Sequence, residues 1–260
     1  MPPARSITTR QIWRLGSSAA GCSDLPGVSE LKSLLAKAPT NGGDEGGLFH
    51  GRREWAVVVD RQGQACAVAA STADPTQVWP GILAIAKAKA YTANAFSLDD
   101  APLSTARRYT LVQPGHSLWG IAASNPFVAG DLVPPNQGSG SSTPRIEGGL
   151  ITVGGGVPLY KNNRIIGALG VSGDTACADH ETAKRMRNEA GLNPAGGMHA
   201  DDIAYPAVDK PSVYLHPYCA NTYRNGKFLG QESPGTYDLG NAPRNATRRK
   251  NGQPATAPKK

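Results

Sequence analysis

One glycine-rich segment, Gly148–Gly173, constrains the fold of this chain more than any other stretch. It contains two short runs rich in β-branched and aliphatic residues, Leu150–Val153 and Ile165–Val171, each bounded by turn-forming residues. Such runs are typical of β-strands. We therefore expect extended structure on both sides of a cluster of three glycines, Gly154, Gly155 and Gly156.

The same segment predicts a hairpin. Asn162-Asn163 can adopt the positive φ angles of a two-residue turn, so Val157–Lys161 and Arg164–Ser172 are expected to pair. The preceding glycine cluster permits either a sharp structural bend or the close approach of a flat ligand to the backbone. It does not open a helix, so a dinucleotide-binding turn is excluded.

Hydrophobic patterns outside this segment indicate three helices and a second hairpin. The helices are expected within Ser29–Ala38, Pro75–Ser97 and Asp179–Ala190, and the hairpin pairs Glu54–Asp60 with Gln64–Ser71. Short turns between paired strands disfavour a parallel sheet. The predicted fold class is α+β, with a five-stranded antiparallel sheet flanked by helices and long irregular insertions and tails.

Three blocks of sequence, taken in order, resemble the GlcG/HbpS-like haem-binding family. They are Trp55–Ala70, Ala86–Phe96 with its alternating lysines, and the Gly-Gly-x-Pro-Leu and Ile-Gly-Ala-Leu-Gly-Val-Ser-Gly motifs within 155–173. The family includes haem-degrading domains and is related to the C-terminal part of PduO-type corrinoid adenosyltransferases. The resemblance implies a profilin-like layered fold and a domain over residues 28–192. An extension (1–27), an irregular segment packed on the domain (193–243) and a disordered basic tail (244–260) would surround it.

Charge and hydropathy limit the partners. The net charge of +7 is due to six basic residues from Arg244 onward, and without them 21 basic face 20 acidic residues. That tail has no interleaved aromatics, so we expect no nucleic-acid binding. No run reaches the length of a membrane span, and no apolar leader follows Arg5 and Arg10. A cytoplasmic location is expected, with a periplasmic or secreted one as the alternative if a leader has been removed.

The four cysteines allow two interpretations. Cys177-x2-His180 and His216-x2-Cys219 have spacings that can place thiolate and imidazole ligands on one zinc ion. Alternatively, two disulfides, Cys177–Cys219 and Cys22–Cys66, would tie poorly structured segments to the domain. Free buried thiols are a third possibility.

A haem site is expected from the resemblance. His50, His116, His180, His199 and His216 could each ligate iron, and His116 is favoured because Gly115 and Trp119 flank it. Lys89 could lay its stem on the core and present its ammonium at the rim to an anionic carboxylate, while Gly154–Gly156 supply the shape. The resemblance adds Ser104 and Thr105, since some members use a hydroxyl residue after the corresponding helix.

The functional prediction is a haem-binding protein for haem uptake, storage or redox sensing. Gly170-Val-Ser-Gly173 lacks the spacing of a nucleophile elbow, and we find no catalytic constellation. Two alternatives remain: an enzyme that degrades haem or acts on a small hydroxy acid or aldehyde, and an accessory subunit without a cofactor. A homo-oligomer of two to eight subunits is expected from the resemblance.

Overall fold

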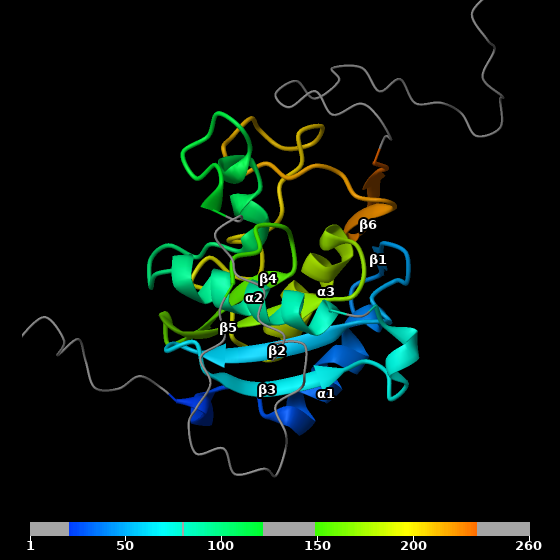
Figure 1. Cartoon of the computed structure of the whole chain (residues 1–260), viewed down its shortest axis with the longest axis vertical. Helices are drawn as coiled ribbons and strands as arrows, with labels where there is room; N and C mark the ends of the chain where they lie inside the picture. Colours follow the sequence, from blue (N-terminus) through cyan, green and yellow to red (C-terminus); the bar gives the residue numbers. More distant parts are fainter. Residues whose placement is uncertain (1–20, 80, 122–148, 233–260) are drawn as a thin grey trace, which may run out of the picture.

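A four-stranded antiparallel sheet with strand order β3-β2-β5-β4 forms the centre of the molecule (Figure 1). The computed structural model describes residues 21–79, 81–121 and 149–232. The strands are β2 (Trp55–Asp60), β3 (Ala65–Ala70), β4 (Gly156–Lys161) and β5 (Arg164–Ser172). Both predicted hairpins are therefore present.

Each hairpin turn has the local chemistry that its sequence requires. Asn162 and Asn163 have φ angles of 51° and 60°, as a two-residue turn with positive φ demands. In the β2–β3 turn, Asp60 Oδ1 accepts hydrogen bonds from the backbone N–H groups of Gln62 and Gln64, both at 2.9 Å. A carboxylate that satisfies two turn amides fixes the register of the hairpin.

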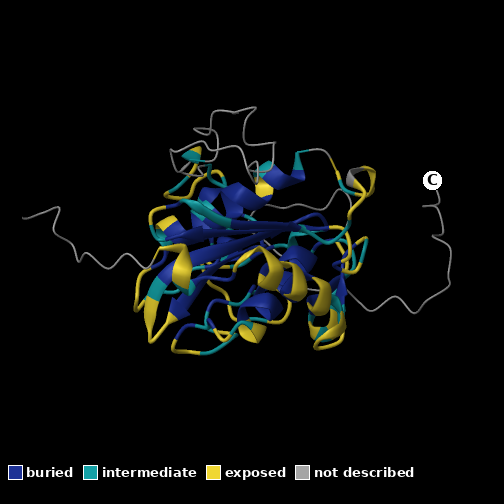
Figure 2. Cartoon of the chain, turned by 90° about the horizontal axis from the view of Figure 1, so that it is seen from below, coloured by how far each residue is buried: buried dark blue, intermediate teal, exposed yellow. Residues whose placement is uncertain are grey.

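Helices cover both faces of the sheet, and Figure 2 shows the buried strands between them. Side chains of β2 alternate between the faces: Val57 and Val59 pack toward α2 (Ile82–Phe96), whereas Val58 belongs to the opposite core. That opposite face is covered by α1 (Val28–Lys37) and α3 (Ala176–Glu189). The result is a layered α/β/α arrangement with two cores.

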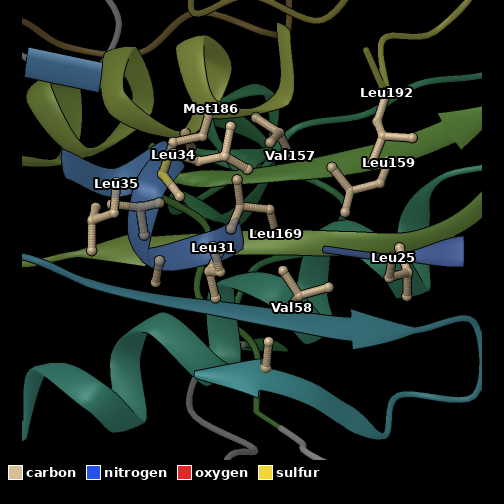
Figure 3. Packing of buried hydrophobic residues seen from close by; sticks show 14 of the residues in the cluster. Leu25, Leu31, Leu34, Leu35, Val58, Val157, Leu159, Leu169, Met186 and Leu192 are labelled. Atoms are coloured by element: carbon tan, nitrogen blue, oxygen red, sulfur yellow. The ribbon is translucent and has the colours of Figure 1, made fainter. Parts of the chain in front are cut away.

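The larger core lies between the sheet, α1 and α3 (Figure 3). Leu31, Leu34 and Leu35 of α1 recur at helical spacing and are buried against the sheet. Leu169 of β5 and Met186 of α3 complete the contact. Burial of a leucine side chain contributes about 1.5–3 kcal/mol, so this cluster is a main source of stability.

On the other face, α2 approaches the sheet unusually closely. Its buried stripe is built of Ala86, Ala90 and Ala93, and β5 presents Gly170 beneath it. A Cβ at Gly170 would overlap the carbonyl oxygen of Ala86 and the amide of Ala90. Small residues on both sides thus set the helix–sheet distance.

The prediction of one five-stranded sheet is wrong. Leu150–Val153 is irregular, and its backbone bonds to α2, where Thr92 Oγ1 accepts from Ile151 N at 3.0 Å. A separate two-stranded sheet joins β1 (Asp44–Gly46) to β6 (Thr222–Gly230), in regions expected to be irregular. Strand β1 has only three residues and is polar, and β6 is interrupted by Asn-Gly. Neither shows the alternation of apolar and polar residues that predicts a strand, so only their pairing in the structure reveals them.

Helix ends differ from prediction by up to two turns. Helix α2 ends at Phe96 as predicted but begins at Ile82, after Gly81 in the left-handed conformation. Helix α3 begins three residues early because Thr175 Oγ1 caps it, accepting from Ala178 N at 3.3 Å. Short 3₁₀ turns complete the fold: η1 (Cys22–Asp24), η2 (Ala38–Thr40), η3 (Pro75–Gln77), η4 (Thr105–Arg108) and η5 (Thr110–Val112).

Among the described residues, no helix is long and apolar enough to cross a membrane. The predicted basic tail (244–260) lies outside the described residues.

Candidate functional site

Helix α3 is the polar centre of the molecule, because nearly its whole length is buried although few of its residues are apolar. Buried charges are costly unless each is paired. Its buried ionisable residues are Asp179, His180, Glu181, Lys184, Arg185 and Arg187. The partners of these groups, described next, define the chemistry that the fold can support.

Lys89 of α2 is one of these partners. Its Nζ lies 2.6 Å from Asp179 Oδ2 and also donates to Val171 O at 3.1 Å and to Ser172 Oγ at 3.3 Å. Burial raises the pKa of Asp179 to about 6, against the lowering effect of the Lys89 ammonium. Lys89 is only 1% exposed. The expected rim position of its ammonium is therefore wrong.

The glycine cluster adopts the structural bend rather than an open ligand surface. Gly155 has a φ angle of 117°, and a Cβ there would lie 2.7 Å from Lys89 Nζ. A Cβ at Gly154 would lie 3.0 Å from His180 Cβ, and one at Gly156 would lie 2.5 Å from Thr105 Cγ2. The three glycines make room for α2, α3 and η4, and these elements occupy the space that was assigned to a flat ligand.

Ser104 and Thr105 are likewise enclosed. Ser104 Oγ donates to Asp201 O at 2.6 Å, and Thr105 Oγ1 accepts from Gly156 N at 2.9 Å. Both residues are buried. The structure places Thr105 beside the glycine cluster and commits both hydroxyl groups to the backbone.

His116 lies elsewhere, on an exposed turn after η5. Its segment runs beside residues 205–216, where Thr110 Oγ1 donates to Leu215 O at 2.6 Å; Figure 1 shows these green and yellow segments side by side. Trp119, three residues on, is 63% exposed. The predicted set of His116, Lys89 and the glycines is therefore not brought together within one chain.

The cysteines form the two disulfides of the alternative interpretation. Cys177 is bonded to Cys219, with a Cα–Cα distance of 5.9 Å, and Cys22 is bonded to Cys66, with 5.2 Å. Because both sulfurs are bonded to each other, the four-ligand zinc site of Cys177, His180, His216 and Cys219 is not formed in this oxidised state.

The two histidines of that set are buried near the Cys177–Cys219 disulfide. Burial lowers the pKa of His216 to about 4, so its ring is neutral at physiological pH. His216 Nδ1 lies 2.8 Å from Pro217 O, and Nε2 accepts from Gly154 N at 3.4 Å. His180 is 1% exposed, and its Nε2 lies 3.4 Å from Asp202 Oδ1, a charge contact too poorly aligned for a hydrogen bond.

Residues of α3 form buried ion pairs that the sequence analysis did not predict. Arg187 forms a bidentate salt bridge with Asp201. Its two terminal nitrogens donate to the two carboxylate oxygens of Asp201 at 2.6 and 3.1 Å. Lys184 Nζ lies 2.5 Å from Glu181 Oε1 and 3.0 Å from Asp202. The i,i+3 spacing of Glu181 and Lys184 was the available signal, although such pairs usually lie on solvated faces.

Two buried carboxyl groups share one hydroxyl group on α3. Thr182 Oγ1 lies 3.0 Å from Glu45 Oε2 and 3.1 Å from Glu54 Oε1. Burial, reinforced by neighbouring carboxylates, raises the pKa of Glu54 and raises that of Glu45 to about 7 despite Arg185. Sequence alone gave no reason to single out these residues, because β1 was not expected.

The remaining histidines are exposed and close to carboxylates. His50 Nδ1 lies 2.8 Å from Asp44 Oδ1, and His199 Nδ1 lies 3.2 Å from Asp202 Oδ2. His199 also lines two neighbouring surface hollows of about 500 and 320 Å³, the larger next to Arg185 and the smaller next to Arg107.

Comparison with known proteins identifies a family match. Residues 50–187 match the model of the family described as haem degrading protein HbpS-like. No curated protein matches the chain significantly.

Several solved structures are similar at low identity. The protein ORFY of Klebsiella pneumoniae is 22% identical, with 63% of this chain and 86% of that chain covered and a TM-score of 0.44. A complex of PduOC with haem is 20% identical, covering 62% and 89%, with a TM-score of 0.43. A double mutant of Streptomyces reticuli HbpS is 15% identical, covering 72% and 95%, with a TM-score of 0.38. These structures are distant, so the family assignment rests on the sequence match.

Proposed function

Because the chain belongs to the HbpS-like family of haem-degrading proteins, we propose that it binds haem and acts in haem uptake, storage or redox sensing. The single observation that carries this proposal is the family match over residues 50–187. The matched region contains the four-stranded sheet, α2 and nearly all of α3. The proposal concerns haem as ligand; the choice among the three roles is a further prediction.

An exposed histidine is the best candidate for the iron ligand. His180 and His216 are enclosed, whereas His50, His116 and His199 are exposed. His50 and His199 each contact a carboxylate. The His116 side chain makes no hydrogen bond to another described residue, so its ring can bind a metal without loss of an interaction within that part of the chain.

Other groups on the segment that carries His116 suit a flat, anionic, mostly apolar ligand. Trp119 offers an exposed aromatic face on the same turn. Arg107, on the same segment, lies 5.6 Å from the centre of the Tyr214 ring and lines the smaller hollow. A guanidinium group beside an aromatic ring can pair with a carboxylate while the ring packs on the macrocycle. We therefore retain His116 as the proposed ligand and add Arg107 as the proposed propionate partner.

Titration with hemin, followed by its Soret band, tests the proposal. Wild type should show a saturable shift at a fixed stoichiometry, and His116→Ala should weaken hemin binding at least tenfold. His50→Ala and His199→Ala are matched controls because both replace an exposed histidine, and they should bind as wild type does. Loss on His199→Ala alone would make His199, which lines both hollows, the iron ligand in place of His116. Absence of any saturable shift in wild type would contradict haem binding altogether.

Haem degradation is the second candidate, favoured by the description of the matched family. Incubation of the hemin complex with ascorbate and oxygen separates the two. A stable Soret band supports binding without turnover, and loss of the band that requires the protein supports degradation. If hemin does not bind at all, the accessory-subunit alternative is favoured.

The two disulfides favour the periplasmic or secreted alternative over the cytoplasmic one, because disulfides persist in oxidising compartments. Cell fractionation of the native host, followed by detection of the protein with an antibody, tests this location. The protein should appear in the periplasmic or secreted fraction.

A further inference from the structure

Three potential metal ligands converge around the Cys177–Cys219 disulfide. The sulfur atoms of both cysteines and a ring nitrogen of His216 all lie within 4.8 Å of one another, and all three residues are buried. Cys177 is in the first turn of α3, while His216 and Cys219 precede β6. The three ligands that these residues offer after reduction, two thiolates and one imidazole, are of the kinds that zinc prefers.

The backbone around this group is anchored by contacts other than the disulfide. His216 N donates to Ala204 O at 2.8 Å, and Cys219 N donates to Thr222 Oγ1 at 2.8 Å. Cys177 lies in a helix whose N-terminus is capped by Thr175. These contacts should keep the side chains close together after the S–S bond is broken.

The tautomer of His216 is the one that a metal requires. Its Nδ1 lies 2.8 Å from Pro217 O, and a carbonyl oxygen can only accept, so Nδ1 carries the proton. Nε2 is then a lone-pair acceptor, held only by a 3.4 Å contact from Gly154 N. An Nδ1–H group anchored on a carbonyl is the usual way in which proteins orient a ligating imidazole.

His180 is an independent sign that the region can take a ligand. It is 1% exposed, and neither ring nitrogen has a hydrogen-bond partner among the described residues. It follows Cys177 by three residues on α3, so the two side chains share one side of the helix. Nε2 lies 3.4 Å from Asp202 Oδ1 without the geometry of a hydrogen bond, so this imidazole can supply a fourth ligand, as can a water molecule.

We propose that reduction of the Cys177–Cys219 disulfide creates a binding site for a soft divalent cation of the zinc type, held by Cys177, His216 and Cys219. A dithiol or phosphine reductant supplies two electrons, and two protons convert the disulfide into two thiols. The cation then displaces both thiol protons and binds two thiolates. The sulfurs must separate to about 3.7 Å, the spacing of two thiolates at about 2.3 Å from one tetrahedral zinc. A disulfide oxidant, such as an oxidised dithiol, accepts two electrons from the two thiolates, which re-forms the S–S bond and releases the cation. This site does not depend on haem binding.

Cobalt(II) is a suitable probe, because its thiolate complexes have charge-transfer and visible d–d bands that zinc lacks. The full chain is reduced with a phosphine, its free thiols are counted, and Co²⁺ is titrated. Reduced wild type should bind one equivalent and lose the bands when Zn²⁺ is added, whereas the oxidised protein should show no thiolate bands. His216→Gln, which keeps all four thiols, should weaken Co²⁺ binding at least tenfold. His180→Gln weakens it only if His180 is the fourth ligand; unchanged affinity assigns that position to water and leaves the three-residue site intact.

The second disulfide provides a matched control. Cys22, Asp60 and Cys66 form the only other such group in the described residues, but Cys22 is exposed. The double variant Cys22→Ser/Cys66→Ser should keep the cobalt bands, and Cys177→Ser/Cys219→Ser should lose them. The reverse result, or reduced and folded wild type without thiolate bands, would overturn the proposal. Should the reduced chain unfold, refolding on addition of Zn²⁺, seen by circular dichroism, supports the site, and failure to refold contradicts it.

Discussion

At the scale of single residues, the main feature of this molecule is a set of buried charged side chains that form ion pairs with one another. Lys89 is the clearest case, because the same side chain that suggested a ligand contact turns out to join α2 to α3 through Asp179. A lysine on the apolar face of a helix is compatible with either role. Which of the two roles the lysine takes depends on its distance to the nearest carboxylate. That distance cannot be read from the sequence.

Lys89→Met should destabilise the protein by about 3–5 kcal/mol at neutral pH, because it leaves the Asp179 carboxylate buried without its partner. Urea unfolding at pH 7 measures the loss. Lys161→Met is a matched control that breaks the exposed Lys161–Asp24 pair, also 2.6 Å long, and should cost at most about 1 kcal/mol. Equal losses in the two variants would refute the structural role of the buried pair.

The Glu45 carboxyl group should make the stability of the protein fall as pH rises from about 4.5 to about 7. The unfolded chain releases the Glu45 proton near pH 4.5, whereas the folded protein holds it until about pH 7. At Glu45 the folded state binds more protons over this interval, so this group makes the free energy of unfolding decrease with pH, and its effect levels off above pH 7. His216 acts in the opposite direction, because its pKa in the folded protein, about 4, lies below its usual value of 6.5. The shift corresponds to at most about 3 kcal/mol. Urea unfolding between pH 4 and pH 8 measures this slope.

Glu45→Gln mimics the protonated group and should flatten the slope. Glu189→Gln replaces an exposed glutamate of α3 and should leave it as in wild type. Parallel curves for wild type and Glu45→Gln would show that Glu45 does not carry the effect.

At the scale of elements, the glycine cluster determines how closely α2 and α3 approach the sheet. Gly154, Gly155 and Gly156 lie where β4 begins, and each would overlap a neighbouring element if it carried a Cβ. The three glycines that suggested a ligand surface are thus explained by the close packing of α2, α3 and η4 against the start of β4. The same close approach explains the alanine-rich face of α2.

Gly155→Ala should be much more destabilising than Gly115→Ala. Both glycines have positive φ angles, 117° and 85°, so alanine is strained at either position. A Cβ at Gly115 meets no atom within 4 Å among the described residues, and the strain alone costs about 1–2 kcal/mol. At Gly155 the added methyl group also displaces Lys89 Nζ. Thermal unfolding of both variants should therefore give a larger decrease in Tm for Gly155→Ala, and similar decreases would contradict the packing role.

At the scale of the whole molecule, the chain presents several large apolar side chains to solvent. Trp79, Leu48, Trp119 and Phe228 are each 48–63% exposed. Such side chains are suited to contacts between subunits when they cluster. Assembly could also bring His116 of one subunit near elements of another, which a single chain does not do.

We predict a homo-oligomer of two to eight subunits. Light scattering at micromolar concentration should give a mass that is a multiple of 27.1 kDa. Trp119→Ser and Trp79→Ser, measured separately, would indicate which exposed surface takes part. A single species of 27 kDa at all concentrations would contradict the prediction.

The sequence by itself determined the elements with local signals. The two hairpins and the end of α2 at Phe96 follow from turn residues and the hydrophobic period. For the four cysteines the sequence left disulfides, a zinc site and free thiols open, and the structure contains the two disulfides. The family was also readable, because its motifs are contiguous. Tertiary structure alone decided which polar groups meet. The β1–β6 pair, the carboxyl groups at Thr182 and the burial of Lys89 depend on residues distant in sequence. Pairing between strands that are distant in the sequence leaves no periodic pattern of residues within either strand. The free-energy cost of burying a charged side chain depends on its partner, which only the tertiary structure shows.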